Sequence, residues 1–174
     1  IYDSKFLEDV TKVSKKATGM PVFMYLLIQY TKESGAIATL LSLVVIFLLV
    51  LIDFRNLKFA LISLLPLIIG SLWTLAFLVV TDFQLTYMTI MVVPLIIGIG
   101  IDDGVHIIHR YRMEGKNSLP LVLRTTGKAI VLTSVTTMVA FGSLAFSRMV
   151  GYQQVGITLF AGIGFLLILS VIFL

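Results

Sequence analysis

The sequence predicts an all-α integral membrane protein, and three observations support this fold class. Hydrophobic residues make up 59% of the 174 residues, charged residues make up only 13%, and the mean hydropathy is +1.08. A soluble domain would carry about 25% charged residues. The apolar residues gather in five runs, each long enough to cross about 30 Å of hydrocarbon. Because hydrocarbon offers the backbone no hydrogen-bond partners, each run is predicted to be a helix.

These runs divide the chain into an extramembranous segment over residues 1–33 and a transmembrane bundle over residues 34–174. The five helices are predicted at about 35–52, 59–80, 85–110, 129–147 and 152–174. We expect the chain to be part of a larger protein, because it begins at Ile1 without a Met and ends at Leu174 inside an apolar run.

The first 33 residues differ in character from the rest of the chain. Phe6, Val10, Val13 and Ala17 recur at helical spacing between charged residues, which predicts an amphipathic surface helix. A breaker follows at 19–21, where Gly, Met and Pro are adjacent. We interpret this segment as the end of an extramembranous domain; the alternative is a free juxtamembrane linker.

The charged residues orient the bundle. Two loops on the same side carry the basic excess: Arg55 and Lys58 in the first, and Arg110, Arg112, Lys116, Arg124 and Lys128 around the second. The opposite loops carry only Asp82 and Arg148. The positive-inside rule therefore places the basic side in the cytoplasm and predicts a multi-pass protein of the cell's inner, cytoplasmic membrane. Because topology accounts for the net charge of +4, no nucleic-acid partner is expected.

Two adjacent carboxylates, Asp102 and Asp103, interrupt the third apolar run. Each charge near a bilayer centre costs roughly 2.5–3.5 kcal/mol on insertion scales. Asp102 lies roughly 12 Å along the helix from Arg110, and therefore within the hydrocarbon region. Gly98, Asp102 and His106 share one face at i, i+4 and i+8. Such an arrangement predicts a functional site.

Three kinds of chemistry fit this acidic pair, and we favour the first. Burial and an adjacent like charge both oppose full ionisation, so Asp102 and Asp103, with His106 beside them, are expected to exchange a proton near neutral pH. A structural ion pair would need a basic partner from outside this sequence, and a cation site would use the carboxylate oxygens. A metal site built from His106, His109 and Asp102 is less favoured, so no metal is expected.

Glycines flank the two carboxylates in the third apolar run, and hydroxyl-bearing residues occur in the fourth run. Gly98, Gly100 and Gly104 are expected to let a neighbouring helix approach closely. We predict that the face bearing Gly98 and Asp102 packs against a second transmembrane repeat, in the same polypeptide or in a second chain. In the fourth run, Thr133 and Thr137 either donate only to their own helix or form a polar relay bordering the carboxylates.

No enzyme signature is present in the sequence. It contains no phosphate-binding loop, no nucleophile with its base and no zinc-ligand cluster, and it has no cysteine. We therefore expect neither enzymatic activity nor a cofactor.

The stretch from Gly98 to Arg112 combines a GxxxDD pattern, ending at Asp103, with an HxxHRYR run that starts at His106. It resembles the fourth helix of a repeat in the resistance–nodulation–division (RND) superfamily. The similarity is greatest to the MMPL and hopanoid-transporter-like branch, which also resembles sterol-sensing domains. Residues 18–22, 51–56 and 132–142 resemble, in order, the end of the porter domain, the second-to-third helix turn and the fifth helix. One departure is Asp103, where many MMPL members have Tyr.

This resemblance implies five helices of a six-helix repeat, preceded by the end of an extracytoplasmic, porter-type domain. It also implies export of lipids or other hydrophobic molecules driven by the proton motive force, with Asp102 and Asp103 as the coupling carboxylates. The implied partners are membrane lipids, a hydrophobic substrate and a second repeat, which a homo-oligomer could supply. The alternatives are a protein-export accessory of the SecD/SecF kind and a non-transporting sterol-sensing regulator.

Overall fold

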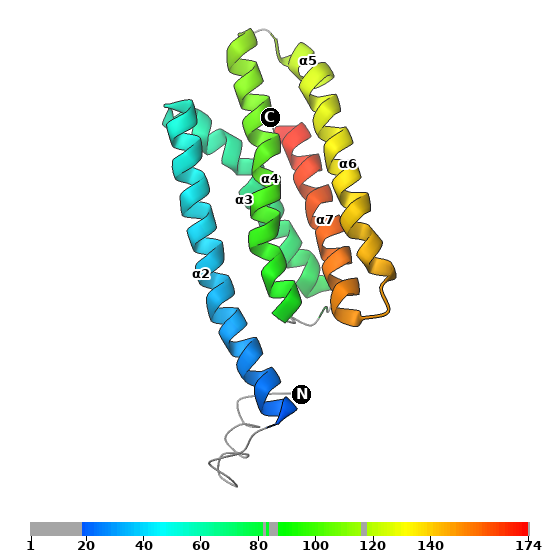
Figure 1. The fold of residues 1–174 in the computed structure, drawn as a ribbon. Coiled ribbons are helices and arrows are strands. Elements are labelled where there is room, and N and C mark those ends of the chain that lie inside the picture. The colour runs from blue at the N-terminus through cyan, green and yellow to red at the C-terminus, as the bar shows by residue number, and fades with distance from the viewer. Residues whose placement is uncertain (1–18, 82, 84–86, 116–117, 174) are drawn as a thin grey trace.

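The computed structural model describes residues 19–81, 83, 87–115 and 118–173, and every regular element in these ranges is helical. The order is α2 (Met20–Phe54), α3 (Leu57–Val80), α4 (Tyr87–Glu114), α5 (Leu119–Val122), the π-helical turn η1 (Leu123–Gly127), α6 (Lys128–Gly142), the 3-10 turn η2 (Ser143–Phe146) and α7 (Val150–Phe173). Five spans are long and apolar enough to cross a membrane. The predicted all-α membrane bundle is confirmed (Figure 1).

Helix α2 is longer than its predicted span. It begins at Met20 with a proline in its first turn, a position where the missing N–H costs nothing, and it runs for 35 residues. The predicted start near residue 35 is therefore wrong, because the apolar stretch before it continues the same helix. At about 1.5 Å per residue, α2 is roughly 52 Å long, so one end projects beyond the other helices (Figure 1).

A two-residue turn joins α2 to α3. Arg55 adopts a left-handed conformation with φ 49°, and its N–H donates to the carbonyl of Leu51. The Asn56 side chain then accepts a hydrogen bond of 3.0 Å from the N–H of Lys58, which caps the start of α3. The turn places Arg55, and Lys58 in the first turn of α3, at one end of the bundle.

Helix α4 is the central element, in contact with α2, α3 and α7. Leu67 of α3, Ile96 and Ile97 of α4, and Leu159 and Leu166 of α7 are almost completely buried where these helices meet. Lipid tails are as apolar as these side chains, so their association depends on close van der Waals packing rather than on exclusion of water. This core holds α4 in place and thereby fixes the position of its acidic pair.

The fourth span also starts earlier than predicted. It runs from Leu119 to Phe146, through α5, η1, α6 and η2, instead of starting near residue 129. Pro120 stands in the first turn of α5, where proline favours helix initiation. Arg124 and Lys128, which marked a loop in the sequence, are in fact carried on the helix.

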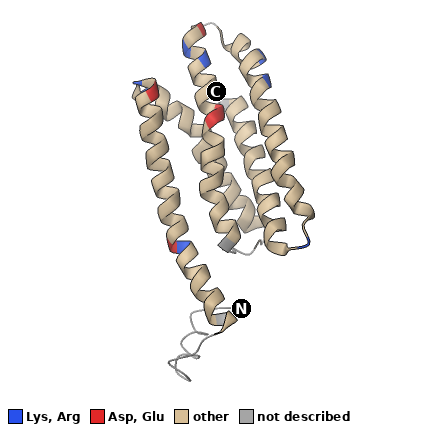
Figure 2. Ribbon diagram, viewed as in Figure 1, with Lys and Arg blue, Asp and Glu red and all other residues tan. Residues whose placement is uncertain are grey.

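Basic residues are grouped at one end of the bundle, on the α2–α3 turn, the end of α4 and the start of the fourth span (Figure 2). This grouping follows from threading the helices in order, as the charge pattern predicted. Arg148 lies at the opposite end, between η2 and α7. The predicted amphipathic segment at Phe6, Val10, Val13 and Ala17, and the loop residues Asp82 and Lys116, lie outside the described residues.

Candidate proton-coupling site

The two adjacent carboxylates of α4 have different surroundings, because successive residues on a helix point about 100° apart. Asp103 is half-buried, and its Oδ2 accepts a hydrogen bond of 3.3 Å from the Oγ of Ser134 on α6. The Asp102 side chain is exposed, and within the described ranges it has no hydrogen-bond or ion-pair partner. One carboxylate is therefore anchored inside the bundle while the other remains accessible.

A small cavity of about 110 Å³ lies beside both carboxylates. Its polar wall is formed by α4 and α6, and α7 closes it with apolar side chains. The lining residues are Ile99, Gly100, Asp102, Asp103, Thr133, Ser134, Thr137, Ile163 and Leu166. A polar cavity of this size has room for a few water molecules with several hydrogen-bond partners.

A larger cavity, of about 490 Å³, continues from the carboxylates toward the basic end of the bundle. It is lined by Asp102, Asp103, His106, Arg110, Thr125, Thr126, Ala129, Ile130 and Thr133. The two cavities share Asp102, Asp103 and Thr133, so they meet at the acidic pair. Asp102, His106 and Arg110 follow one another at four-residue intervals, and they form a titratable and charged edge along α4.

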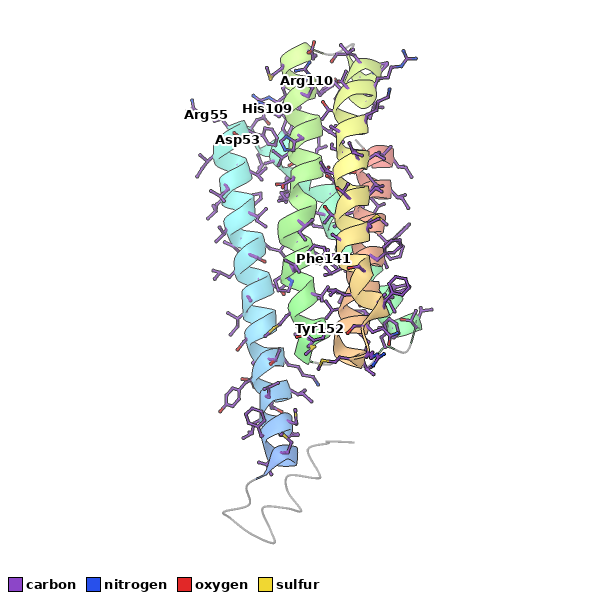
Figure 3. The ribbon with its side chains drawn as sticks, turned by 45° about the vertical axis from the view of Figure 1, so that its right-hand side comes forward. Asp53, Arg55, His109, Arg110, Phe141 and Tyr152 are labelled. Carbon is purple, nitrogen blue, oxygen red and sulfur yellow. The ribbon has the colours of Figure 1, made fainter. Side chains whose placement is uncertain are left out.

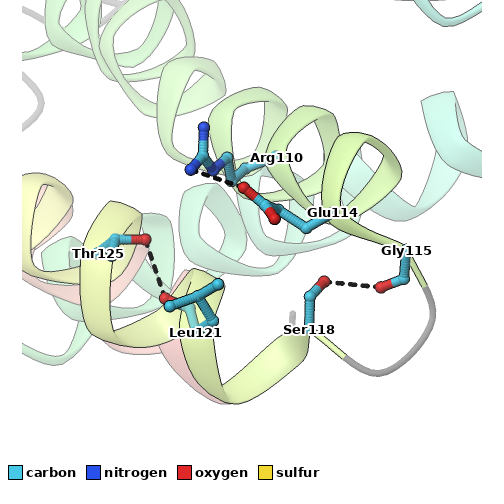
Figure 4. A network of polar contacts seen from close by, with 6 residues as sticks. All are labelled: Arg110, Glu114, Gly115, Ser118, Leu121 and Thr125. Carbon is cyan, nitrogen blue, oxygen red and sulfur yellow. Dashed lines mark hydrogen bonds and ion pairs between the residues drawn. The ribbon is translucent and has the colours of Figure 1, made fainter.

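Arg110 lies at the end of this larger cavity and is turned toward the end of its own helix. Its Nη2 forms an ion pair of 2.7 Å with Oε1 of Glu114, as Figure 4 shows. Its Nε is buried and has no hydrogen-bond partner among the residues described. The neighbouring His109 is exposed and does not line either cavity; Figure 3 places both residues near the basic end.

The hydroxyl groups of Thr133 and Thr137 line the small cavity, but their protons are used within α6. Thr133 Oγ1 donates to the carbonyls of Ala129 and Ile130, at 3.1 and 3.0 Å, and Thr137 Oγ1 donates to the carbonyl of Thr133 at 2.7 Å. Their oxygens can still accept hydrogen bonds from water. The hydroxyl that reaches α4 is that of Ser134, which the sequence had not singled out.

The three glycines near the carboxylates have different neighbours. At Gly104 an added Cβ would run into the backbone carbonyl of Ser63 on α3, so these two helices approach too closely for a side chain. At Gly100 it would meet the side chain of Leu166. At Gly98 there is nothing within 4 Å, and this position lies on the open face of α4 that also carries Asp102.

Arg112 is a structural residue that sequence reasoning counted only as a topological charge. Its Nη1 donates a hydrogen bond of 3.0 Å to the carbonyl of Phe54, at the end of α2. Its guanidinium carbon also lies 5.6 Å from the ring centroid of Phe54 and 5.2 Å from that of Phe59. Both are within cation–π range. The end of α4 is thus tied to the α2–α3 turn.

The potential metal ligands do not gather at one point. Across the described ranges, no three His, Cys, Asp or Glu side chains come close enough together to hold a metal ion. The arrangement that is present consists of two carboxylates, a histidine and hydroxyl oxygens around connected cavities. Such an arrangement is suited to exchanging protons with water.

Comparison with known proteins matches residues 9–174 to the MMPL family. The chain is 31% identical over 158 residues to the membrane protein MJ1562 of Methanocaldococcus jannaschii, covering 87% of this chain and 41% of that protein. It is 30% identical over 152 residues to the hopanoid transporter HpnN of Rhodopseudomonas palustris, covering 87% of this chain and 17% of the relative. A hopanoid transporter HpnN of Burkholderia multivorans is 30% identical over 136 residues, which cover 78% of this chain and 15% of the relative. The chain therefore spans less than half the length of these relatives. The family match over residues 9–174 confirms the resemblance to the MMPL branch.

Proposed function

The chain belongs to the MMPL family, and from this premise we propose that the full protein moves lipids or other hydrophobic molecules across the cytoplasmic membrane, driven by the proton motive force. In this proposal Asp102 and Asp103, with His106, are the proton-coupling residues of the half that this chain represents. The observation that carries the proposal is the acidic pair at the junction of two polar cavities within an otherwise apolar span.

The energetic argument starts from the cost of placing two carboxylates in a membrane. Each costs several kcal/mol unless it is neutralised, solvated or paired. Asp103 receives a single hydrogen bond, from Ser134. The basic residue nearest along the cavity, Arg110, is paired with Glu114 instead. Since no basic side chain among the described residues neutralises the pair, we infer that protonation removes the charge, and that it is reversible where water reaches the carboxylates.

Reversible protonation supplies the driving force in this proposal. One proton crossing a potential of 100 mV delivers about 2.3 kcal/mol. The neutral and ionised pair differ in their need for water, so each protonation state favours a different packing of α4 against its neighbours. Because Arg112 ties the end of α4 to the end of α2 and the start of α3, a movement of α4 would be passed to the α2–α3 turn.

The open face of α4 favours a second transmembrane repeat as the partner of this site. A Cβ added at Gly98 would meet nothing within 4 Å in the described part of the chain, and Asp102, one helical turn away, is exposed. An exposed carboxylate facing lipid would be costly, whereas coupling sites of transporters commonly lie between two repeats. We place the second repeat, from the same polypeptide or from another copy, against this face.

The names of two relatives favour a lipid as the cargo, and a transport assay tests this. Two relatives are named hopanoid transporters, so a hopanoid is the first probe and a phospholipid the second. The full-length protein is reconstituted in liposomes with an imposed pH gradient, and each lipid is extracted from the outer leaflet by cyclodextrin. We expect the gradient to accelerate the appearance of at least one lipid and a protonophore to abolish that acceleration.

Two results would contradict this proposal. The first is movement of both lipids at rates that do not depend on the gradient. The second is binding of a lipid without any movement, which would favour the sterol-sensing regulator instead.

A further inference from the structure

The face of α6 that points away from the acidic pair forms one wall of a groove shared with α7. The volume of this groove is about 640 Å³. The lining residues are Leu123, Gly127, Lys128, Val131, Leu132, Val135 and Val171. Apart from Lys128, every side chain in this lining is apolar, and Lys128 lies at the basic end of the groove.

Two basic residues stand at this end of the groove, and no described acidic residue pairs with them. Arg124 stands one helical turn before Lys128 and is also exposed. The sequence contains no Asp or Glu after Glu114, and Glu114 itself pairs with Arg110. In the part of the chain that is described, neither Arg124 nor Lys128 forms an ion pair. Two cations are therefore available to an external anion.

The polar and apolar parts of the groove lie at depths that match a phospholipid. Lys128 is separated from Phe146, at the far end of the span, by roughly 27 Å of helix, close to the hydrocarbon thickness of about 30 Å. The Lys128 ammonium group can thus reach the headgroup level by extending along its own stem. Val131, Leu132 and Val135 follow below it, at the level of the acyl chains.

A π-helical turn and a glycine stand at the headgroup end of the groove. The π-helical turn Leu123–Gly127 widens the helix there, and π turns commonly occur at functional positions. Gly127 contributes no side chain to the wall; an added Cβ would come only within 4.0 Å of Leu123. The space between Leu123 and Lys128 therefore remains open.

We propose that this groove binds an anionic phospholipid of the leaflet at the basic end. Its phosphate contacts Lys128 and Arg124, and one acyl chain lies along Val131, Leu132 and Val135. Basic pockets between transmembrane helices are known to select anionic headgroups. A soluble phosphate would use the two cations without the apolar wall. A zwitterionic lipid also carries a phosphate, but the ammonium group of its head offsets that charge and is repelled by Lys128 and Arg124, so it would bind more weakly. The site is separate from the acidic pair and does not depend on coupled transport.

Native mass spectrometry of the full-length, delipidated protein tests this site. Phosphatidylglycerol and phosphatidylcholine with identical acyl chains are titrated separately. We expect one phosphatidylglycerol to bind about tenfold more tightly than phosphatidylcholine, and the double variant Arg124→Gln/Lys128→Gln to lose this preference. Val135→Trp, which fills the apolar part, should weaken phosphatidylglycerol binding without changing any charge. Lys58→Gln, an exposed cation at the same end on α3, is the matched control and should bind like the wild type.

Several outcomes would overturn the proposal. Equal affinity of the wild type for the two lipids would remove the headgroup selection, even if no variant could be purified. Unchanged binding in Val135→Trp would remove the acyl-chain contact. Displacement of the lipid by millimolar inorganic phosphate would show that the cations hold a soluble anion rather than a phospholipid.

Discussion

Ser134 donates a hydrogen bond of 3.3 Å to Asp103, and this bond joins α6 to α4 at the acidic pair. Ser134 is buried on α6, whereas the threonines around it donate to carbonyls of their own helix. The bond leaves Asp103 anchored between two helices and Asp102 exposed on the open face. If the pair couples protonation to movement, Ser134 transmits the change to α6.

Ser134→Ala should lower gradient-driven transport several-fold while leaving the amount of protein in the membrane unchanged. The variant removes one oxygen and with it the link between the two helices; a single hydrogen bond of this kind is worth about 1 kcal/mol. Transport is measured in the same liposome assay. The control is Ser143→Ala, whose hydroxyl donates only to the carbonyl of Ala140. Equal transport by both variants would exclude a role for the Ser134–Asp103 bond.

Gly104→Ala should destabilise the protein by about 1–3 kcal/mol, because an added methyl group forces α3 and α4 apart. The obstacle is the backbone carbonyl of Ser63, which cannot rotate away as a side chain can. The thermal unfolding midpoint of the purified full-length protein measures the effect. An unchanged midpoint would mean that these helices separate at little cost.

Gly98→Leu tests whether a second repeat covers the open face. Within the described residues an added Cβ at this position meets nothing within 4 Å, so a destabilised or inactive full-length variant would indicate a neighbour from elsewhere. We expect a lower unfolding midpoint and reduced transport. Val139→Leu, at an exposed position of α6, is the control and should behave like the wild type. A Gly98→Leu protein as stable and active as the wild type would indicate that this face points at lipid.

The larger cavity should admit water from the basic side of the membrane. Ala129→Cys lines this cavity, whereas Leu132→Cys lies on the same helix and faces the apolar groove. The printed sequence has no cysteine, and any others in the full-length protein are replaced. A membrane-impermeant thiol reagent should modify Ala129→Cys in inside-out vesicles but not in intact cells, and should leave Leu132→Cys unmodified in both. Modification of Ala129→Cys in intact cells would reverse the proposed orientation.

The helices themselves were largely predictable, because a hydrocarbon environment leaves few alternatives to an apolar helix. The ends of α3, α4 and α7 lie within a few residues of the predicted limits. The predicted start near residue 35 failed because Lys32 and Glu33 resemble a boundary in sequence, yet the helix carries both. Arg124 and Lys128 likewise resembled loop residues in sequence, so the fourth span was predicted to start near residue 129 although the helix carries both.

The carboxylates of the site could be predicted from the sequence, but the residue on α6 that contacts them could not. Two carboxylates in an apolar run are conspicuous, so Asp102 and Asp103 could be identified directly. Ser134 could not be distinguished from Thr133 or Thr137, because a nearly uniform apolar helix shows no periodicity to indicate which side faces α4. The Arg110–Glu114 pair is an i,i+4 contact that helical spacing allows. The contact of Arg112 with Phe54 instead depends on how the helix ends pack, which the local sequence does not encode.

The central claim is that Asp102 and Asp103 couple proton movement to transport. Single variants should show which of the two contributes more. Asp102→Asn keeps the shape of the side chain but removes its titration, so transport should be abolished while membrane insertion is retained. Asp103→Asn should also impair transport, to a smaller extent, because its amide can still accept the hydrogen bond from Ser134. A stronger effect at Asp103 than at Asp102 would reverse this ranking.

The most direct measurement is gradient-driven lipid transport, with simultaneous proton uptake into the liposomes, by the double variant Asp102→Asn/Asp103→Asn. Proton coupling at this pair predicts that the variant inserts and folds like the wild type, as judged by its unfolding midpoint, but shows neither proton uptake nor gradient-dependent transport. Wild-type proton uptake and transport in the double variant would contradict the account, and would leave the two carboxylates with a structural role.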